Sequence, residues 1–109
     1  MEKRQKQRTL KRLFVRFGNE KPEHIGFTHD LSATGIFLKT NTVFPPNTRL
    51  QIELTLPDET VLCCRGIVMW AKRIPPALNR MVQKHGMGVR LLEIPEAYKA
   101  LIDRLNIKL

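Results

Sequence analysis

The sequence predicts a mainly β fold in which five or six antiparallel strands close into a small barrel and one helix follows. A chain of 109 residues suffices for one domain with a single modest core. Apolar and polar residues alternate along most of the region 12–93, as they do in half-buried strands. After this region the apolar spacing changes to three and four residues, which is typical of an amphipathic helix.

The predicted strands lie between clear turn signals. They are expected in the segments RLFVRFG (12–18), HIGFTHDLS (24–32), GIFLKT (35–40), LQIELTL (50–56), VLCCRGIVMW (61–70) and GMGVRLLE (86–93). The turn sequence PDET (57–60) joins two of them into a hairpin. The segment 73–85 is broken by prolines and is expected to be a loop, while Gly86 and Gly88 permit a bulge or a close backbone approach.

The helix is predicted over 95–107. Pro95 and Glu96 are favourable residues for a first helical turn. The apolar face is formed by residues at helical spacing, namely Ala97, Tyr98, Leu101, Ile102 and Leu105. Such a helix can cover an open end or edge of a small barrel.

Cysteine and histidine positions predict neither a disulfide nor a metal site. Cys63 and Cys64 are adjacent on a strand and therefore point to opposite faces. His24, His29 and His85 lack the partner spacing of known metal motifs. The apolar runs are far shorter than the roughly 20 residues of a membrane helix, and the charged N-terminus does not resemble a signal sequence, so a cytoplasmic location is expected.

Positive charge is concentrated at the N-terminus. The chain carries a net charge of +9. The first sixteen residues contain one acid, Glu2, and a series of basic residues, namely Lys3, Arg4, Lys6, Arg8, Lys11, Arg12 and Arg16. A flexible basic arm over 1–11, attached to a more balanced body, indicates an anionic partner such as a phosphate. A solubilising tail is the alternative.

Two short motifs occur in a defined order along the chain. The segment RQKQR places Arg4 and Arg8 in an R-x-x-x-R pattern, and DLSATG places Asp30, Ser32 and Gly35 in a D/N-x-S-x-x-G pattern. With GIVMW, GMGVRLL and the terminal helix, these motifs resemble the PilZ domain, a bacterial receptor module for cyclic di-GMP. The resemblance implies a single domain over 1–109, with the arm at 1–11, a six-stranded antiparallel barrel at 12–93 and the helix at 95–107.

The residue types of the two motifs suit guanine recognition. Guanine presents O6 and N7 to the planar fork of an arginine, and its flat face can stack on a second guanidinium group. A carboxylate such as Asp30 can accept the N1–H and N2–H donors of the opposite edge. Ser32 would share this face if the segment stayed extended, and Gly35 permits a positive φ or close packing of ligand and arm. The alternative for DLSATG is an Asx-type turn in which Asp30 and Ser32 bond their own backbone.

The arginine motif has two possible registers, because Arg8 and Arg12 also have this spacing. Counting back from Val15 and Phe17 in the first predicted strand favours the pair Arg4 and Arg8. Lys3, directly before Arg4, is a possible secondary ligand contact. In this interpretation the protein is not an enzyme, the ligand is cyclic di-GMP, and the arm changes conformation on binding and signals to a separate protein.

Two other functions are compatible with a small basic barrel. It could bind single-stranded nucleic acid through exposed aromatic residues. Alternation assigns most of the aromatic residues to the core, however; the full set is Phe14, Phe17, Phe27, Phe37, Phe44, Trp70 and Tyr98. It could also be a protein-interaction module that does not bind nucleotide. A hydrolase is disfavoured because no nucleophile and base have a recognisable spacing.

Overall fold

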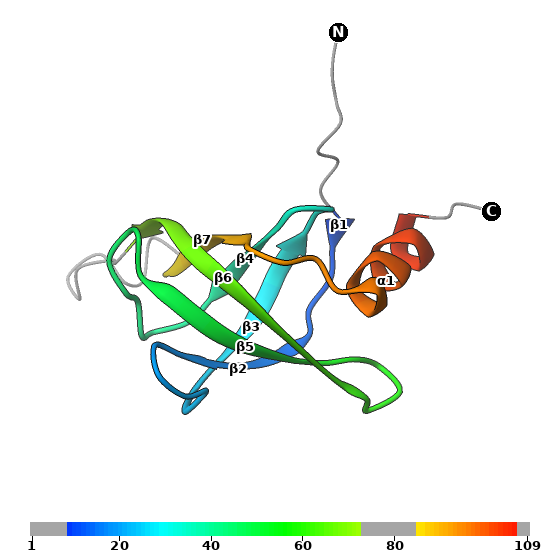
Figure 1. The fold of residues 1–109 in the computed structure, drawn as a ribbon, viewed down its shortest axis with the longest axis horizontal. Coiled ribbons are helices and arrows are strands. Elements are labelled where there is room, and N and C mark those ends of the chain that lie inside the picture. Colours follow the sequence, from blue (N-terminus) through cyan, green and yellow to red (C-terminus); the bar gives the residue numbers. More distant parts are fainter. Residues whose placement is uncertain (1–8, 73–84, 107–109) are drawn as a thin grey trace, which may run out of the picture.

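A computed structural model describes residues 9–72 and 85–106. Its elements, shown in Figure 1, are β1 (Thr9–Leu10), β2 (Phe14–Gly18), β3 (His24–Leu31), β4 (Gly35–Lys39), β5 (Arg49–Thr55), β6 (Val61–Lys72), β7 (Gly86–Leu91) and α1 (Glu96–Asn106). Arg4, Arg8 and Lys3 lie outside the described residues.

The sheet closes into a barrel. Its strand order is β1-β3-β2-β5-β6-β7-β4, and the additional pairing of β3 with β4 joins the two sides. All of these pairings are antiparallel. Closure satisfies the backbone groups that an open sheet would leave at its edges. The predicted six-stranded antiparallel barrel is therefore confirmed as β2 to β7. β1 is an additional short strand inside the segment 1–11 that was predicted to be a flexible arm, because Thr9 and Leu10 pair with the end of β3.

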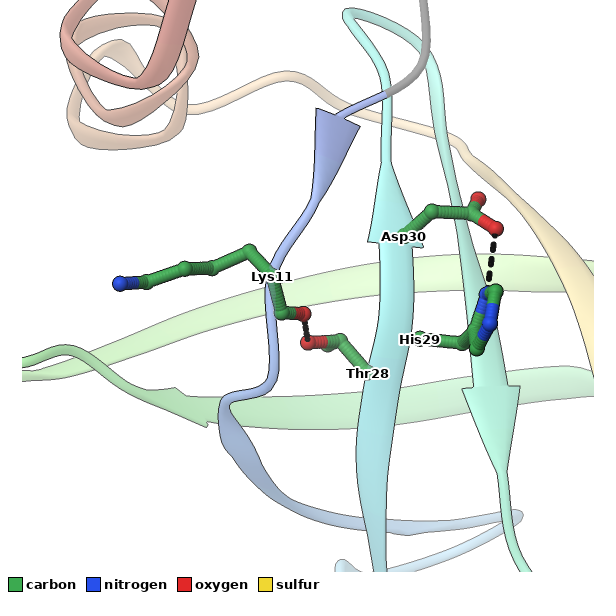
Figure 2. A network of polar contacts seen from close by, with 4 residues as sticks. All are labelled: Lys11, Thr28, His29 and Asp30. Carbon is green, nitrogen blue, oxygen red and sulfur yellow. Dashed lines mark hydrogen bonds and ion pairs between the residues drawn. The ribbon is translucent and has the colours of Figure 1, made fainter.

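Residues 11–13 separate β1 from β2 and belong to no strand. Thr28 of β3 forms hydrogen bonds with both ends of this interruption. The Oγ1 atom of Thr28 accepts a hydrogen bond from the Leu13 N–H at 2.8 Å and donates one to the Lys11 carbonyl oxygen (Figure 2). The Thr28 N–H in turn donates to the Leu13 carbonyl oxygen at 2.9 Å. The hydrogen bonds of the Thr28 side chain thus take the place of backbone hydrogen bonds between strands where regular pairing is interrupted. β1 stays paired with the C-terminal end of β3.

The core follows the alternation of the sequence. In β5, Leu50, Ile52 and Leu54 are buried, and residues between them point outward. Val15 and Phe17 do the same in β2. The inward residues of neighbouring strands pack against one another. β4 departs from this pattern, because Gly35 to Leu38 are all buried.

The helix completes the core from one side. It begins after Pro95, whose carbonyl oxygen accepts hydrogen bonds from the N–H groups of Tyr98 and Lys99. Tyr98, Leu101 and Ile102 are almost fully buried in the same hydrophobic cluster as the strands. The predicted helix is present. Tyr98, Leu101 and Ile102 of its predicted apolar face pack on the barrel, whereas Ala97 of that face is exposed.

The hairpin between β5 and β6 uses the predicted turn. The Leu56 N–H donates to the Thr60 carbonyl oxygen at 2.8 Å, and Glu59 has a φ of 73°. The Thr60 N–H donates to Oδ1 of Asp58 at 3.0 Å. Hydrogen bonds from the backbone and the side chain of Thr60 hold the pKa of Asp58 below its ordinary value.

The two cysteines lie on opposite faces of β6, as alternation predicts: Cys63 is exposed and Cys64 is buried. Burial, with the neighbouring Cys63 as a smaller cause, raises the pKa of the Cys64 thiol to about 12. The thiolate is the reactive form of cysteine. The two thiols should therefore differ strongly in reactivity.

We expect iodoacetamide to modify Cys63 and to spare Cys64 in the folded protein. Peptide mass spectrometry after a short reaction near neutral pH measures the two sites separately. Denaturation in urea should make both cysteines react. Equal modification of both in the folded state would contradict the burial of Cys64.

Candidate functional site

The first groove is a depression of about 610 Å³ on the outside of the barrel. Its lining comes from the end of β3, the β3–β4 turn, and strands β4, β6 and β7; it consists of Asp30, Thr34, Gly35, Ile36, Phe37, Met69, Trp70, Lys72, Gly88, Val89 and Arg90. The groove therefore combines one carboxylate, two cationic side chains and an exposed aromatic ring. Asp30 and Gly35 are the two motif residues that line it.

A bulge in β3 brings Asp30 to this surface. Thr28 pairs with Leu38 and Asp30 pairs with Phe37, so the extra residue His29 has no partner position on β4. Because a bulge shifts the alternation by one residue, His29 and Asp30 both reach the outer side while Thr28 and Leu31 are buried. Nδ1 of His29 lies 2.9 Å from Oδ2 of Asp30 (Figure 2).

Ser32 occupies a different environment from Asp30. The strand ends at Leu31, so the extended geometry that would place Ser32 beside Asp30 is absent. The Ser32 side chain is buried, and its Oγ accepts hydrogen bonds from the N–H groups of Gly35 at 3.2 Å and Thr34 at 3.4 Å. Ser32 thus stabilises the turn that forms the rim of the groove, and a contact between Ser32 and a ligand stays a prediction.

Gly35 is needed for close packing of two strands. It does not have a positive φ. A Cβ atom at this position would lie 2.8 Å from the carbonyl oxygen of Val89 on β7. The absence of a side chain therefore lets the start of β4 approach β7, and this approach forms the floor of the first groove.

Trp70 is the groove residue whose position differs most from the one that alternation predicts. Alternation assigned it to the core with Val68, but the pairing of β6 with β7 shifts between these two residues. Trp70 is consequently 47% exposed. Its ring packs on Phe37, with centroids 5.2 Å apart, and covers Gly88, where a Cβ would lie 2.1 Å from the indole Nε1.

Only one sequence signal pointed toward this arrangement. The glycines of GMGVRLL indicated a close approach to that strand, and the indole ring of Trp70 makes this approach at Gly88. The positions of Lys72 and Arg90 in the groove were not predicted. Both follow from the register of β7 between β4 and β6, which pairs Gly35 with Arg90 and Lys72 with Gly86.

The helix holds the rim of the groove in place. The buried hydroxyl of Tyr98 donates to the carbonyl oxygen of Ser32 at 2.6 Å and lies 3.2 Å from that of Gly35. Both carbonyl groups belong to the turn of the DLSATG motif. The position of this turn therefore depends on the packing of α1.

Two further kinds of feature are absent from the described parts of the chain. Within residues 9–72 and 85–106, no group of three or more His, Cys, Asp or Glu side chains could hold a metal ion. In those same segments no helix has the length and apolar character needed to cross a bilayer.

Comparison with known proteins identifies the family. The model of the PilZ domain matches residues 2–108, so the chain belongs to the PilZ domain family. Its barrel is also similar to the solved structure of the Bacillus subtilis inhibitor of motility MotI/DgrA, with a TM-score of 0.72 and 22% sequence identity. The match covers 96% of this chain and 50% of that one, so this chain spans about half of its length. No curated protein matches.

We expect Tyr98→Phe to lower the free energy of unfolding by roughly 1–3 kcal/mol, because the buried hydrogen bond from the Tyr98 hydroxyl to the Ser32 carbonyl oxygen is lost. Urea denaturation measures this change. Hydrogen exchange should also accelerate at the amides of the Ser32–Gly35 turn. Lys99→Ala, at the exposed neighbouring position, serves as the control. Unchanged stability and exchange in Tyr98→Phe would show that the helix does not hold the turn.

Proposed function

We propose that this chain is a receptor for cyclic di-GMP that binds the dinucleotide between the first groove and the N-terminal arm and signals to a separate protein. PilZ domains are binding modules rather than enzymes, and cyclic di-GMP is their usual ligand. The observation that carries the proposal is that the carboxylate of Asp30 and an exposed indole ring line the same groove. These two groups meet the polar edge and the flat face of a guanine.

Asp30 provides the acceptor for the base. Its side chain is only 15% exposed, which leaves the carboxylate partly shielded from water. In such a setting a charge-assisted hydrogen bond is stronger than at the open surface. The N1–H and N2–H donors of guanine are adjacent, so one carboxylate can accept both.

Trp70 and two cations complete the complement to the ligand. The ring of Trp70 is held by Phe37 and Gly88, so stacking a base on it costs little side-chain entropy. Lys72 and Arg90 line the same groove and supply positive charge for the two phosphates. A flat base, an acceptor and phosphate-binding cations are the three requirements of this ligand.

The pairing of β1 supports a role for the arm. Thr9 pairs with Leu31, and Leu10 pairs with Asp30. Arg8 directly precedes Thr9 in the sequence. We assign Arg4 and Arg8 to the second face and the O6 and N7 edge of the guanines, with Lys3 as a secondary contact.

Signalling follows from ordering of the arm in this proposal. The first eight residues are almost entirely polar and have few apolar groups to bury, so they gain little that could offset the entropy of ordering. Ligand contacts at Arg4 and Arg8 supply that free energy. The ordered arm with its ligand then presents a new surface to a partner protein.

We expect calorimetric titration to show binding of cyclic di-GMP and much weaker binding of cyclic di-AMP. The N6 amine of adenine would face the arginine donors where guanine presents O6. Equal affinity for the two dinucleotides would contradict base recognition. Binding of neither would favour a protein-interaction module, and tighter binding of an oligonucleotide would favour nucleic acid as the ligand.

A substitution that keeps the charge separates base recognition from bulk electrostatics. Arg8→Lys retains the charge and loses the planar fork, and should weaken binding of cyclic di-GMP by roughly 1–3 kcal/mol, the usual scale of a bidentate base contact. Lys11→Ala removes a charge outside the motif and should have little effect. If Lys11→Ala were the more damaging change, the arm would act as an unspecific cationic tail.

A further inference from the structure

A second groove lies on the barrel beside the first and shares none of its lining residues. It has a volume of about 620 Å³ and is lined by residues 10–12, by residues 25–29 of β3, and by the end of β4 with the residues that follow it. His29 lines this groove, whereas Asp30 lines the first. The bulge in β3 therefore forms the boundary between the two grooves.

The charges of the second groove all have one sign. Lys11, Arg12 and Lys39 line it, and no Asp or Glu is found among the described residues that do so. None of these three cations forms an ion pair within residues 9–72 and 85–106. The guanidinium group of Arg12 instead lies 3.9 Å from the ring centroid of Phe27. The groove is thus complementary to negative charge.

The same groove also exposes aliphatic side chains. Leu10 is 73% exposed and Ile25 is 57% exposed. Of the exposed large hydrophobic residues in the described parts of the chain, these two line the second groove, Met69 and Trp70 line the first, and Val61 lines neither. Exposed apolar groups that gather at a groove rather than scatter over the surface indicate a binding surface.

Segments of this chain do not complement the groove. The undescribed segments 1–8 and 73–84 carry several Lys and Arg residues and contain Glu2 as their one acid. Like charges would repel them from Lys11, Arg12 and Lys39. The complementary occupant must therefore bring carboxylates from another molecule.

We propose that the second groove docks an acidic segment of a partner protein that presents aliphatic side chains between its carboxylates. Carboxylates of the segment pair with Lys11 and Lys39, and its aliphatic side chains cover Leu10 and Ile25. A nucleic acid fits less well, because the phenyl ring of Phe27 is already occupied by Arg12 and offers no free stacking platform. The proposal does not depend on nucleotide binding.

The test is an NMR titration of the full chain, without cyclic di-GMP, with a short blocked peptide that alternates glutamate and leucine. We expect saturable shifts at the amides of Leu10, Ile25, Thr28 and Lys39. A peptide with glutamine for glutamate, and one with glycine for leucine, should each bind more weakly, because one loses the charge and the other loses the apolar contacts.

Charge reversal locates the interaction. The double variant Lys11→Glu/Lys39→Glu should weaken binding of the glutamate–leucine peptide by roughly tenfold, the sum expected for two ion pairs at the protein surface. Lys21→Glu/Arg49→Glu reverses two exposed charges outside the groove and should bind as the unmodified chain does. The amide spectrum of each variant reports whether it is folded.

Several outcomes would overturn the proposal. They are absence of saturable shifts, shifts centred on the first groove, equal binding of the glutamine peptide, and equal weakening in the two double variants. Tighter binding of an oligonucleotide or of anionic lipid vesicles at the same amides would assign the groove to a different class of partner. Because no nucleotide is present, failure here is distinguishable from failure to bind cyclic di-GMP.

Discussion

The bulge in β3 between Thr28 and Asp30 is the constraint on which both surfaces of this domain depend. One additional residue changes which side chains face outward. Thr28 turns inward and forms hydrogen bonds with the residues between β1 and β2, while His29 and Asp30 both turn outward. Without the bulge, one of these two outward residues would point into the core. The carboxylate of the first groove and the boundary with the second groove have the same origin.

The rim of the first groove depends on a contact between distant parts of the sequence. The turn at 32–35 joins β3 to β4 and has few of the backbone hydrogen bonds that pair regular strands. The Tyr98 hydroxyl donates a hydrogen bond to its Ser32 carbonyl oxygen and lies 3.2 Å from its Gly35 carbonyl oxygen. This hydroxyl is buried, so the hydrogen bonds are shielded from competing water. The C-terminal helix therefore both fills the core and fixes the position of the motif turn.

The two grooves have different chemistry although they are neighbours. The first groove contains an acceptor, cations and a rigid indole ring, which suits a small ligand with a flat base and phosphates. The second contains cations and aliphatic side chains without a carboxylate among its described lining residues. His29 contacts Asp30 on one side and packs against Phe37, with ring centroids 5.4 Å apart. A single residue thus touches groups of the first groove while it lines the second.

The sequence by itself determined the barrel strands, the helix and the opposite orientations of Cys63 and Cys64, because alternation and helical spacing are local properties of the chain. It also singled out Asp30 and Gly35, which line the first groove, and Arg4 and Arg8, whose role stays a prediction. Only the tertiary structure decided where the alternation shifts. The bulges at His29 and before Trp70 exist relative to partner strands, so no local pattern could reveal that Trp70 faces outward.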